Sequence, residues 1–182
     1  MRRATLLALP AALLLGACSV AEYQYPSAWD PLPAAPAGCG HLAGTYADRG
    51  EAGGQPGEAP SLALQLFGPN SPWEKAVSVT LALPSADALE VTVSDRSGPI
   101  VTRLLKANAD EFACKAGRLV VRGKRWIATD LVMGRQGFVV ELAAAPKYLV
   151  AKVNEETYGT LFVVVPIAGT AQHWYRFPRI AP

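Results

Sequence analysis

The sequence predicts a mainly β domain, a single antiparallel meander that either closes into a barrel or folds into a two-layer sheet. Short apolar segments alternate with turn-rich connectors from residue 76 onward, and no stretch shows a long helical periodicity. Within residues 89–95, Leu89, Val91 and Val93 share one face of a strand, and the residues between them are polar. Closure or a second layer is expected because a long exposed edge would pair with other chains.

The expected strands are joined by connectors rich in Gly, Pro, Asp, Asn and Ser, the residue types that favour turns. The strands cover residues 76–83, 89–94, 100–106, 111–114, 118–122, 126–133, 138–144, 148–153, 160–165 and 173–177. The connectors lie at residues 84–87, 95–98, 123–124, 134–137, 154–157 and 168–169. The segment SLALQLFG at 61–68 fits either a short helix or a first strand.

Residues 1–17 precede this domain and have the three parts of a secretory signal peptide. Arg2 and Arg3 give a positive start, residues 4–15 are almost wholly apolar, and two small residues come before Cys18. The apolar part is too short for a stable membrane span. We therefore expect these residues to be removed during export.

The end of this segment, Leu15-Gly16-Ala17-Cys18, resembles the lipobox of bacterial lipoproteins. The resemblance implies a diacylglyceryl group on the Cys18 thiol, cleavage just before Cys18, and acylation of the new amine. Two or more acyl chains anchor a protein stably, whereas one does not. Ser19 stands where an Asp would favour inner-membrane retention, which implies an outer-membrane lipoprotein facing the periplasm. The alternative is an ordinary secreted protein whose cleavage site lies near a cysteine.

The sequence divides the chain into a signal peptide (1–17), a lipidated Cys18 with a flexible tether (18–38), and a β-rich globular domain (39–182). The tether is predicted because the segment is rich in Pro and Ala and has no hydrophobic periodicity. Its aromatic residues Tyr23, Tyr25 and Trp29 fit two positions equally well, at the lipid headgroups or docked on the domain.

Charge composition argues against a nucleic-acid partner. The chain has 17 Lys+Arg and 15 Asp+Glu, and removal of Arg2 and Arg3 brings the net charge to about zero. The chain after the signal peptide is long enough for one domain with a real core. The apolar run at 161–168 is short and broken by Pro166, so we expect a buried strand there.

With Cys18 taken by lipid, Cys39 and Cys114 remain, and two cysteines in an exported protein most simply form a disulfide bond. Its role would be structural. The alternatives are two free thiols, or a reactive Cys39 beside His41.

No catalytic or metal-binding constellation is evident, and we expect neither an enzyme nor a cofactor. The Gly-x-Ser-x-Gly motif of hydrolases is missing, and Ser71 and Lys75 are spaced wrongly for a Ser-x-x-Lys motif. His41 and His173 are expected to be unrelated surface or capping residues. Asp130, within an apolar segment, either faces solvent or is paired in a cavity.

One concentration of positive charge stands out, with no acidic residue inside it and Trp126 beside it: Lys115, Arg118, Arg122, Lys124 and Arg125. On two adjacent strands joined near Gly123, these residues would form a patch for an anionic partner such as lipid phosphate, a peptidoglycan carboxylate or an acidic protein. The alternative is a solvated hairpin end whose charges discourage aggregation.

Two function classes follow. The segment CGHLAGTYADRGE is similar to the start of the mature domain of many bacterial lipoproteins, and Gly44-Thr45-Tyr46 resembles the Gly-x-Trp element of lipocalins. The first class is a non-enzymatic, lipid-anchored module that binds or helps assemble another envelope protein or cell-envelope polymer. The second, implied by the lipocalin resemblance, is a barrel that carries a small apolar ligand.

Overall fold

The computed structural model describes residues 18–54, 59–69, 73–128, 132–161 and 165–180. In this part of the chain the protein is mainly β, and one 11-stranded sheet contains all the strands. The strands are β1 (Cys18–Glu22), β2 (Gly44–Ala47), β3 (Glu51–Ala52), β4 (Ser78–Ser85), β5 (Ala88–Asp95), β6 (Gly98–Lys106), β7 (Phe112–Lys115), β8 (Arg118–Ala128), β9 (Val132–Ala144), β10 (Tyr148–Leu161) and β11 (Val165–Ile180). The helices are α1 (Leu62–Phe67) and the short 3-10 turns η2 (Gly40–Leu42), η3 (Trp73–Lys75) and η4 (Ala107–Ala109).

The predicted fold class is confirmed as a mainly β, antiparallel sheet, and the sheet is not closed into a barrel. Its strand order is β6-β5-β4-β2-β11-β10-β9-β8-β7, so that β6 and β7 are the edges although they follow each other in sequence. Only β1, which lies off this path, pairs in parallel, with β11. The other edge of β11 is shared by β1, β3 and β2 in turn.

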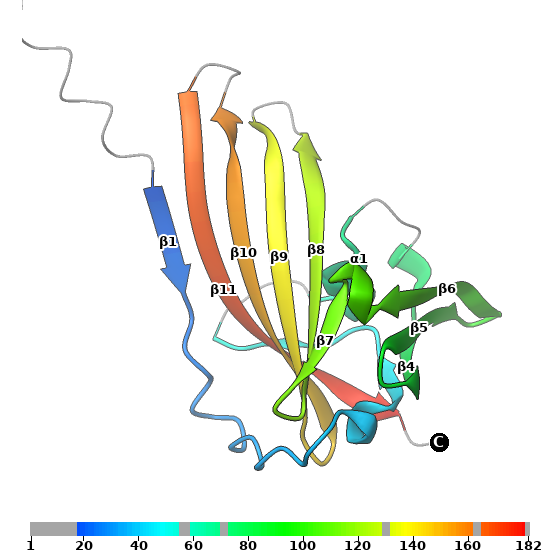
Figure 1. Ribbon diagram of the computed structural model, residues 1–182. Coiled ribbons are helices and arrows are strands. Elements are labelled where there is room, and N and C mark those ends of the chain that lie inside the picture. Colours follow the sequence, from blue (N-terminus) through cyan, green and yellow to red (C-terminus); the bar gives the residue numbers. More distant parts are fainter. Residues whose placement is uncertain (1–17, 55–58, 70–72, 129–131, 162–164, 181–182) are drawn as a thin grey trace, which may run out of the picture.

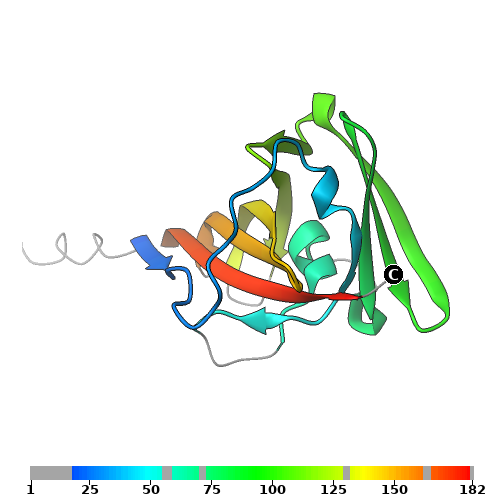
Figure 2. The same ribbon diagram turned by 90° about the horizontal axis from the view of Figure 1, so that it is seen from below.

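The sheet has two parts that differ in strand length. The long-strand half consists of β8, β9, β10 and β11, which stand side by side in Figure 1. The short-strand half consists of β2, β4, β5 and β6, and the C-terminal end of β11 joins it through β2. Seen from below, the two halves lie on either side of α1 (Figure 2).

Helix α1 resolves the ambiguity of the 61–68 segment. The Ser61 hydroxyl caps the helix by accepting a hydrogen bond from the Leu64 N–H at 3.1 Å. Gly68 ends it with a φ of 82°, a conformation that glycine adopts without strain. Leu62, Ala63 and Leu66 are buried in the space between the two halves.

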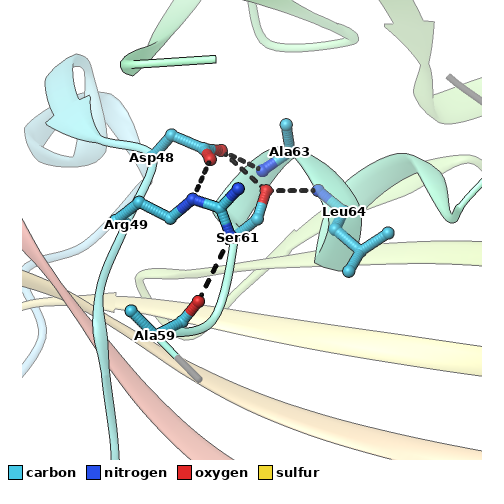
Figure 3. Close-up of polar contacts among 6 residues, drawn as sticks. All are labelled: Asp48, Arg49, Ala59, Ser61, Ala63 and Leu64. Atoms are coloured by element: carbon cyan, nitrogen blue, oxygen red, sulfur yellow. Dashed lines mark hydrogen bonds and ion pairs between the residues drawn. The ribbon is translucent and has the colours of Figure 1, made fainter. Parts of the chain in front are cut away.

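A buried aspartate fixes the start of α1 (Figure 3). Asp48 accepts hydrogen bonds from the Ser61 hydroxyl and from the Ala63 N–H, both at 2.9 Å. Arg49 lies beside its second oxygen, with Nε 3.7 Å away. Burial raises the pKa of the Asp48 carboxyl, and the two hydrogen bonds and the Arg49 charge offset part of that effect.

The space inside the curved sheet is filled by side chains. Tyr46, Phe112 and Phe177 are fully buried there, together with aliphatic residues from both halves. The Tyr46 hydroxyl donates to the Leu42 carbonyl at 2.8 Å, so the Gly44-Thr45-Tyr46 element packs into the core. Cys39 and Cys114 form the predicted disulfide bond, which joins the segment before η2 to β7.

The strands predicted at 76–83, 89–94, 100–106 and 111–114 correspond to β4, β5, β6 and β7. The connectors predicted at 123–124, 134–137, 154–157 and 168–169 are wrong, because all four lie inside the long strands β8 to β11. Gly123 marks a site where the Phe138 ring occupies the space of a side chain, so a Cβ there would collide with the ring. The loops between β8 and β9 and between β10 and β11 lie outside the described residues.

In the structure, the segment expected to be a tether lies against the sheet at several points. Residues Cys18–Glu22 form β1. Tyr23 stacks on His173 with 5.4 Å between ring centroids, and Tyr25 meets Trp174 edge-on at 5.1 Å. The Arg176 guanidinium lies 4.9 Å from the centre of the Trp29 ring. Of the two positions open to these aromatic residues, the structure has the docked one.

Candidate functional site

Cys18, the predicted lipidation site, lies at the margin of the sheet. It begins β1, which among the described strands pairs only with β11. β1 runs parallel to β11, with Cys18 opposite Ala168 and Glu22 opposite Gln172. The start of β1 is therefore close to the start of β11, near the ends of the long strands that point away from the short-strand half (Figure 1).

The register of the sheet places Cys18 in one row with residues of all four long strands. Ala168 of β11 is opposite Tyr158 of β10, Tyr158 is opposite Arg135 of β9, and Arg135 is opposite Trp126 of β8. The row across five strands is Cys18, Ala168, Tyr158, Arg135 and Trp126, and we call it the cysteine row. Its members come from distant parts of the sequence.

The cysteine row and the strand residues beyond it form what we call the distal end: residues 126–128, 132–135, 158–161 and 165–168. Arg135 is the only charged residue among these strand residues. Large apolar or aromatic side chains are exposed here, with 64% of Trp126, 53% of Met133 and 58% of Tyr158 accessible. Val20 of β1 is exposed nearby. The distal end is therefore an apolar surface with one cation.

A partly buried polar cluster lies on the inner face just below the cysteine row. The Arg125 guanidinium donates to the Gln136 side-chain oxygen and to Glu155, the latter at 2.8 Å. The Gln136 amide donates to the other Glu155 oxygen at 2.9 Å. Below this cluster the inner face is packed with core residues such as Phe138 and Val153. The cluster thus marks the boundary between the packed base of the long strands and the distal end.

Tyr175 lies on the inner face of β11 near the same boundary. Burial, with a smaller contribution from the nearby Glu155 carboxylate and an opposing one from Arg125, raises the pKa of its phenol to about 12. A phenol with so high a pKa stays protonated at neutral pH and is a poor base. The cluster is suited to closing the core rather than to proton transfer.

Four of the five basic residues of the sequence cluster share one face of β7 and β8, because Lys115 lies directly opposite Arg118. Alternation along β8 puts Arg118, Arg122 and Lys124 on one face and Arg125 on the other. Arg118 pairs with Glu141 at 3.9 Å, and Arg122 pairs with Asp110 at 3.1 Å. Lys115 lies on β7 and is exposed, as is Lys124. Three of the five positive charges therefore have carboxylate partners.

The remaining residues considered for chemistry lie apart. His41 is in η2 and lines a shallow depression with Pro36 and Arg179, whereas His173 stacks between Tyr23 and Tyr175 farther along β11. Ser71 and Asp130 lie outside the described residues. Within the described ranges, no group of three or more His, Cys, Asp or Glu side chains is arranged to hold a metal ion. No described helix has the length and apolar character needed to cross a membrane.

Comparison of the chain with protein-family models, with curated proteins and with solved structures finds no match. The candidate site therefore rests on the residues themselves. Sequence reasoning singled out Cys18 as a predicted site but not Arg135 or Tyr158, because their relation to Cys18 arises from strand register and has no local signal.

Proposed function

We propose that this chain is a lipoprotein of the bacterial cell envelope, held in the outer membrane by acyl chains on Cys18 and facing the periplasm. In this proposal it acts without catalysis, as a module that binds or helps assemble another envelope protein or a cell-envelope polymer. The observation that carries the proposal is the sequence Leu15-Gly16-Ala17-Cys18 after a positively charged start and an apolar stretch.

The filled interior favours a binding module over a carrier. A carrier of the lipocalin kind needs a cavity inside a closed barrel. Here the sheet is open, and its inside is occupied by Tyr46, Phe112, Phe177 and the side chains of α1. The surface is then the part of the molecule that is left to recognise another component. The disulfide bond between Cys39 and Cys114 is consistent with an oxidising compartment such as the periplasm.

The anchor is tested by labelling cells with a palmitate analogue and analysing the N-terminal peptide of the purified protein by mass spectrometry. We expect acyl chains on Cys18, a chain that begins at Cys18, and no label in a Cys18→Ala variant. Ser19→Ala is the matched control, and it should be labelled as the natural chain is. Label retained by Cys18→Ala, or an unmodified Cys18 in the natural chain, would refute the anchor.

The binding role is tested by photo-cross-linking in intact cells from Leu104, which is half exposed on the edge strand β6. We expect adducts with a defined envelope protein or polymer from this position, and none from the same cross-linker at the fully buried Val93. If neither Leu104 nor other exposed positions of the short-strand half give an adduct, the binding role is wrong.

A further inference from the structure

We infer that the distal end is a bilayer-contacting surface: the cysteine row lies at the lipid headgroups, and the strand residues beyond it enter the boundary between headgroups and acyl chains. This inference deepens the proposed function and rests on it, because it takes the acyl chains of Cys18 as the point where the molecule meets the membrane. It adds that the protein meets the bilayer through its sheet as well as through its lipid, in one fixed orientation.

The first argument is the register of Cys18 with the four long strands. Cys18 is in register with Ala168, Tyr158, Arg135 and Trp126, so a membrane surface at Cys18 that runs along the row meets all four long strands. On β10, three residues of the strand follow Tyr158. At about 3.3 Å per residue, these extend roughly 10 Å beyond the row. That length matches the depth of about 5–10 Å to which interfacial segments enter a bilayer.

The second argument is the order of residue types. Trp126, Arg135 and Tyr158 occupy the cysteine row, and Trp and Tyr are the residues enriched at membrane–water interfaces. The Arg135 guanidinium lies 4.9 Å from the centre of the Trp126 ring and adds a positive charge at the level of the lipid phosphates. Beyond the row, the described strand residues are uncharged.

The third argument is that the fold itself gives no reason for apolar residues at the distal end. The Arg125, Gln136 and Glu155 cluster closes the core below the cysteine row. Met133 and Tyr158 lie on the opposite, outer face of the sheet, where about half or more of each side chain is exposed. In a soluble domain these positions would normally be polar, and a contiguous apolar surface marks a contact site.

The position of Cys18 selects a bilayer as the occupant. A second copy of the chain or an apolar peptide would also cover the distal end, but neither accounts for the anchor residue being in the same row. Acyl chains on Cys18 would hold this end at the bilayer at high effective concentration, so even a modest apolar contact becomes populated.

The test uses the four tryptophans of the chain. Trp73 is buried in the core, and Trp126 is exposed in the cysteine row. Trp29 of the N-terminal segment and Trp174 of β11 are partly buried, and both contact the Tyr25 ring. The acylated protein is reconstituted into vesicles of phosphatidylethanolamine and phosphatidylglycerol whose acyl chains carry bromine near the glycerol or at mid-chain. We expect bromine near the glycerol to quench the Trp126 emission more strongly than bromine at mid-chain. The emission of Trp126 is obtained by comparison with a Trp126→Phe variant.

A matched pair of variants separates contact through the distal end from anchoring by lipid alone. Met133→Asp places a charge beyond the cysteine row, and Leu104→Asp places the same charge at a side chain of nearly equal exposure on β6, 50% against 53%. We expect Met133→Asp to lose most of the quenching of Trp126 and Leu104→Asp to retain it. Circular dichroism of both variants confirms that the sheet is intact.

Quenching of Trp126 that Met133→Asp removes would support the bilayer contact. Trp126 emission that brominated lipid leaves unchanged, in a protein shown by mass spectrometry to be acylated and vesicle-bound, would overturn the contact while leaving the anchor standing. If the protein purified from cells carries no acyl chains yet binds vesicles and shows quenching of Trp126, the proposed anchor is refuted and the bilayer contact stands. A dimer cross-linked through the distal end in vesicles, with Trp126 shielded from bromine, would overturn the bilayer in favour of a second copy.

Discussion

The base and the distal end of the same four strands are both apolar, but the apolar side chains are buried in the base and exposed at the distal end. In the base, Leu119 faces Leu142 and Val121 faces Val140 across the sheet, and all four are buried under the short-strand half and α1. At the distal end, Trp126, Met133 and Tyr158 have no layer over them. Hydrophobicity in the base stabilises the fold, and at the distal end it is available for contact with something outside the chain. The predictions below test this division, beginning with the largest effect.

A truncation in the base should be costly, and the same kind of truncation at the distal end should not. Phe177→Ala removes a fully buried ring, and we expect it to lower the free energy of unfolding by about 3–5 kcal/mol. Met133→Ala should change it by no more than about 0.5 kcal/mol. Urea denaturation followed by circular dichroism measures both. Equal effects of the two variants would contradict the division.

Loss of the disulfide bond should have the second largest effect on stability. It joins Cys39 to Cys114, which are 75 residues apart in sequence, and so restricts the unfolded chain strongly. We expect the double variant Cys39→Ser, Cys114→Ser to lose about 2–4 kcal/mol of unfolding free energy on urea denaturation. Reduction of the natural protein with dithiothreitol should give the same loss. A natural protein whose unfolding is insensitive to dithiothreitol would refute this role.

Substitutions in the polar cluster should lower the free energy of unfolding by less. The loss should depend on whether one charge is removed or both members of the pair are removed together. Glu155→Ala leaves the Arg125 guanidinium and the Gln136 amide without their shared partner, and we expect a loss of about 1–3 kcal/mol in the free energy of unfolding. The double variant Arg125→Leu, Glu155→Leu removes both charges together, and we expect it to be less destabilised than Glu155→Ala. Thermal unfolding compares the two, and the reverse order would contradict the assignment.

Long strands and their register were harder to predict than short strands. In the short-strand half, the turns at residues 86–87 and 96–97 follow local signals that sequence reasoning identified correctly. In the long-strand half, similar signals mislead, because their causes are tertiary. Gly123 makes room for the Phe138 ring, and Glu155 tolerates a strand interior because Arg125 reaches it from another strand. The hypothesis for Cys18 comes from its neighbours in sequence and stays a prediction, whereas the cysteine row depends on pairing between strands far apart in the chain.

The buried carboxyl of Asp48, at the start of α1, should give the smallest effect on stability, and this effect depends on pH. Since burial raises the pKa of Asp48 in the folded protein above its unfolded value, the stability linked to its protonation is fully present below the unfolded pKa. That stability is lost as the pH rises through the folded pKa. Asp48→Asn keeps an oxygen for the two hydrogen bonds and does not titrate.

We therefore expect the free energy of unfolding of the natural protein, relative to Asp48→Asn, to fall as the pH rises from the ordinary Asp range toward neutrality. Urea denaturation of both proteins at a series of pH values measures this difference. A difference that stays constant with pH would refute the linkage.

The pairing of β1, β3 and β2 along one edge of β11 has a consequence for biosynthesis. Strands β1, β2 and β3 precede their partner β11 by more than a hundred residues, so this part of the sheet cannot form until β11 has been synthesised. Contacts between the two ends of a chain also make folding slow. In the export route proposed above, a polypeptide whose sheet waits for β11 would stay unfolded enough to pass a narrow translocation channel until that strand has followed.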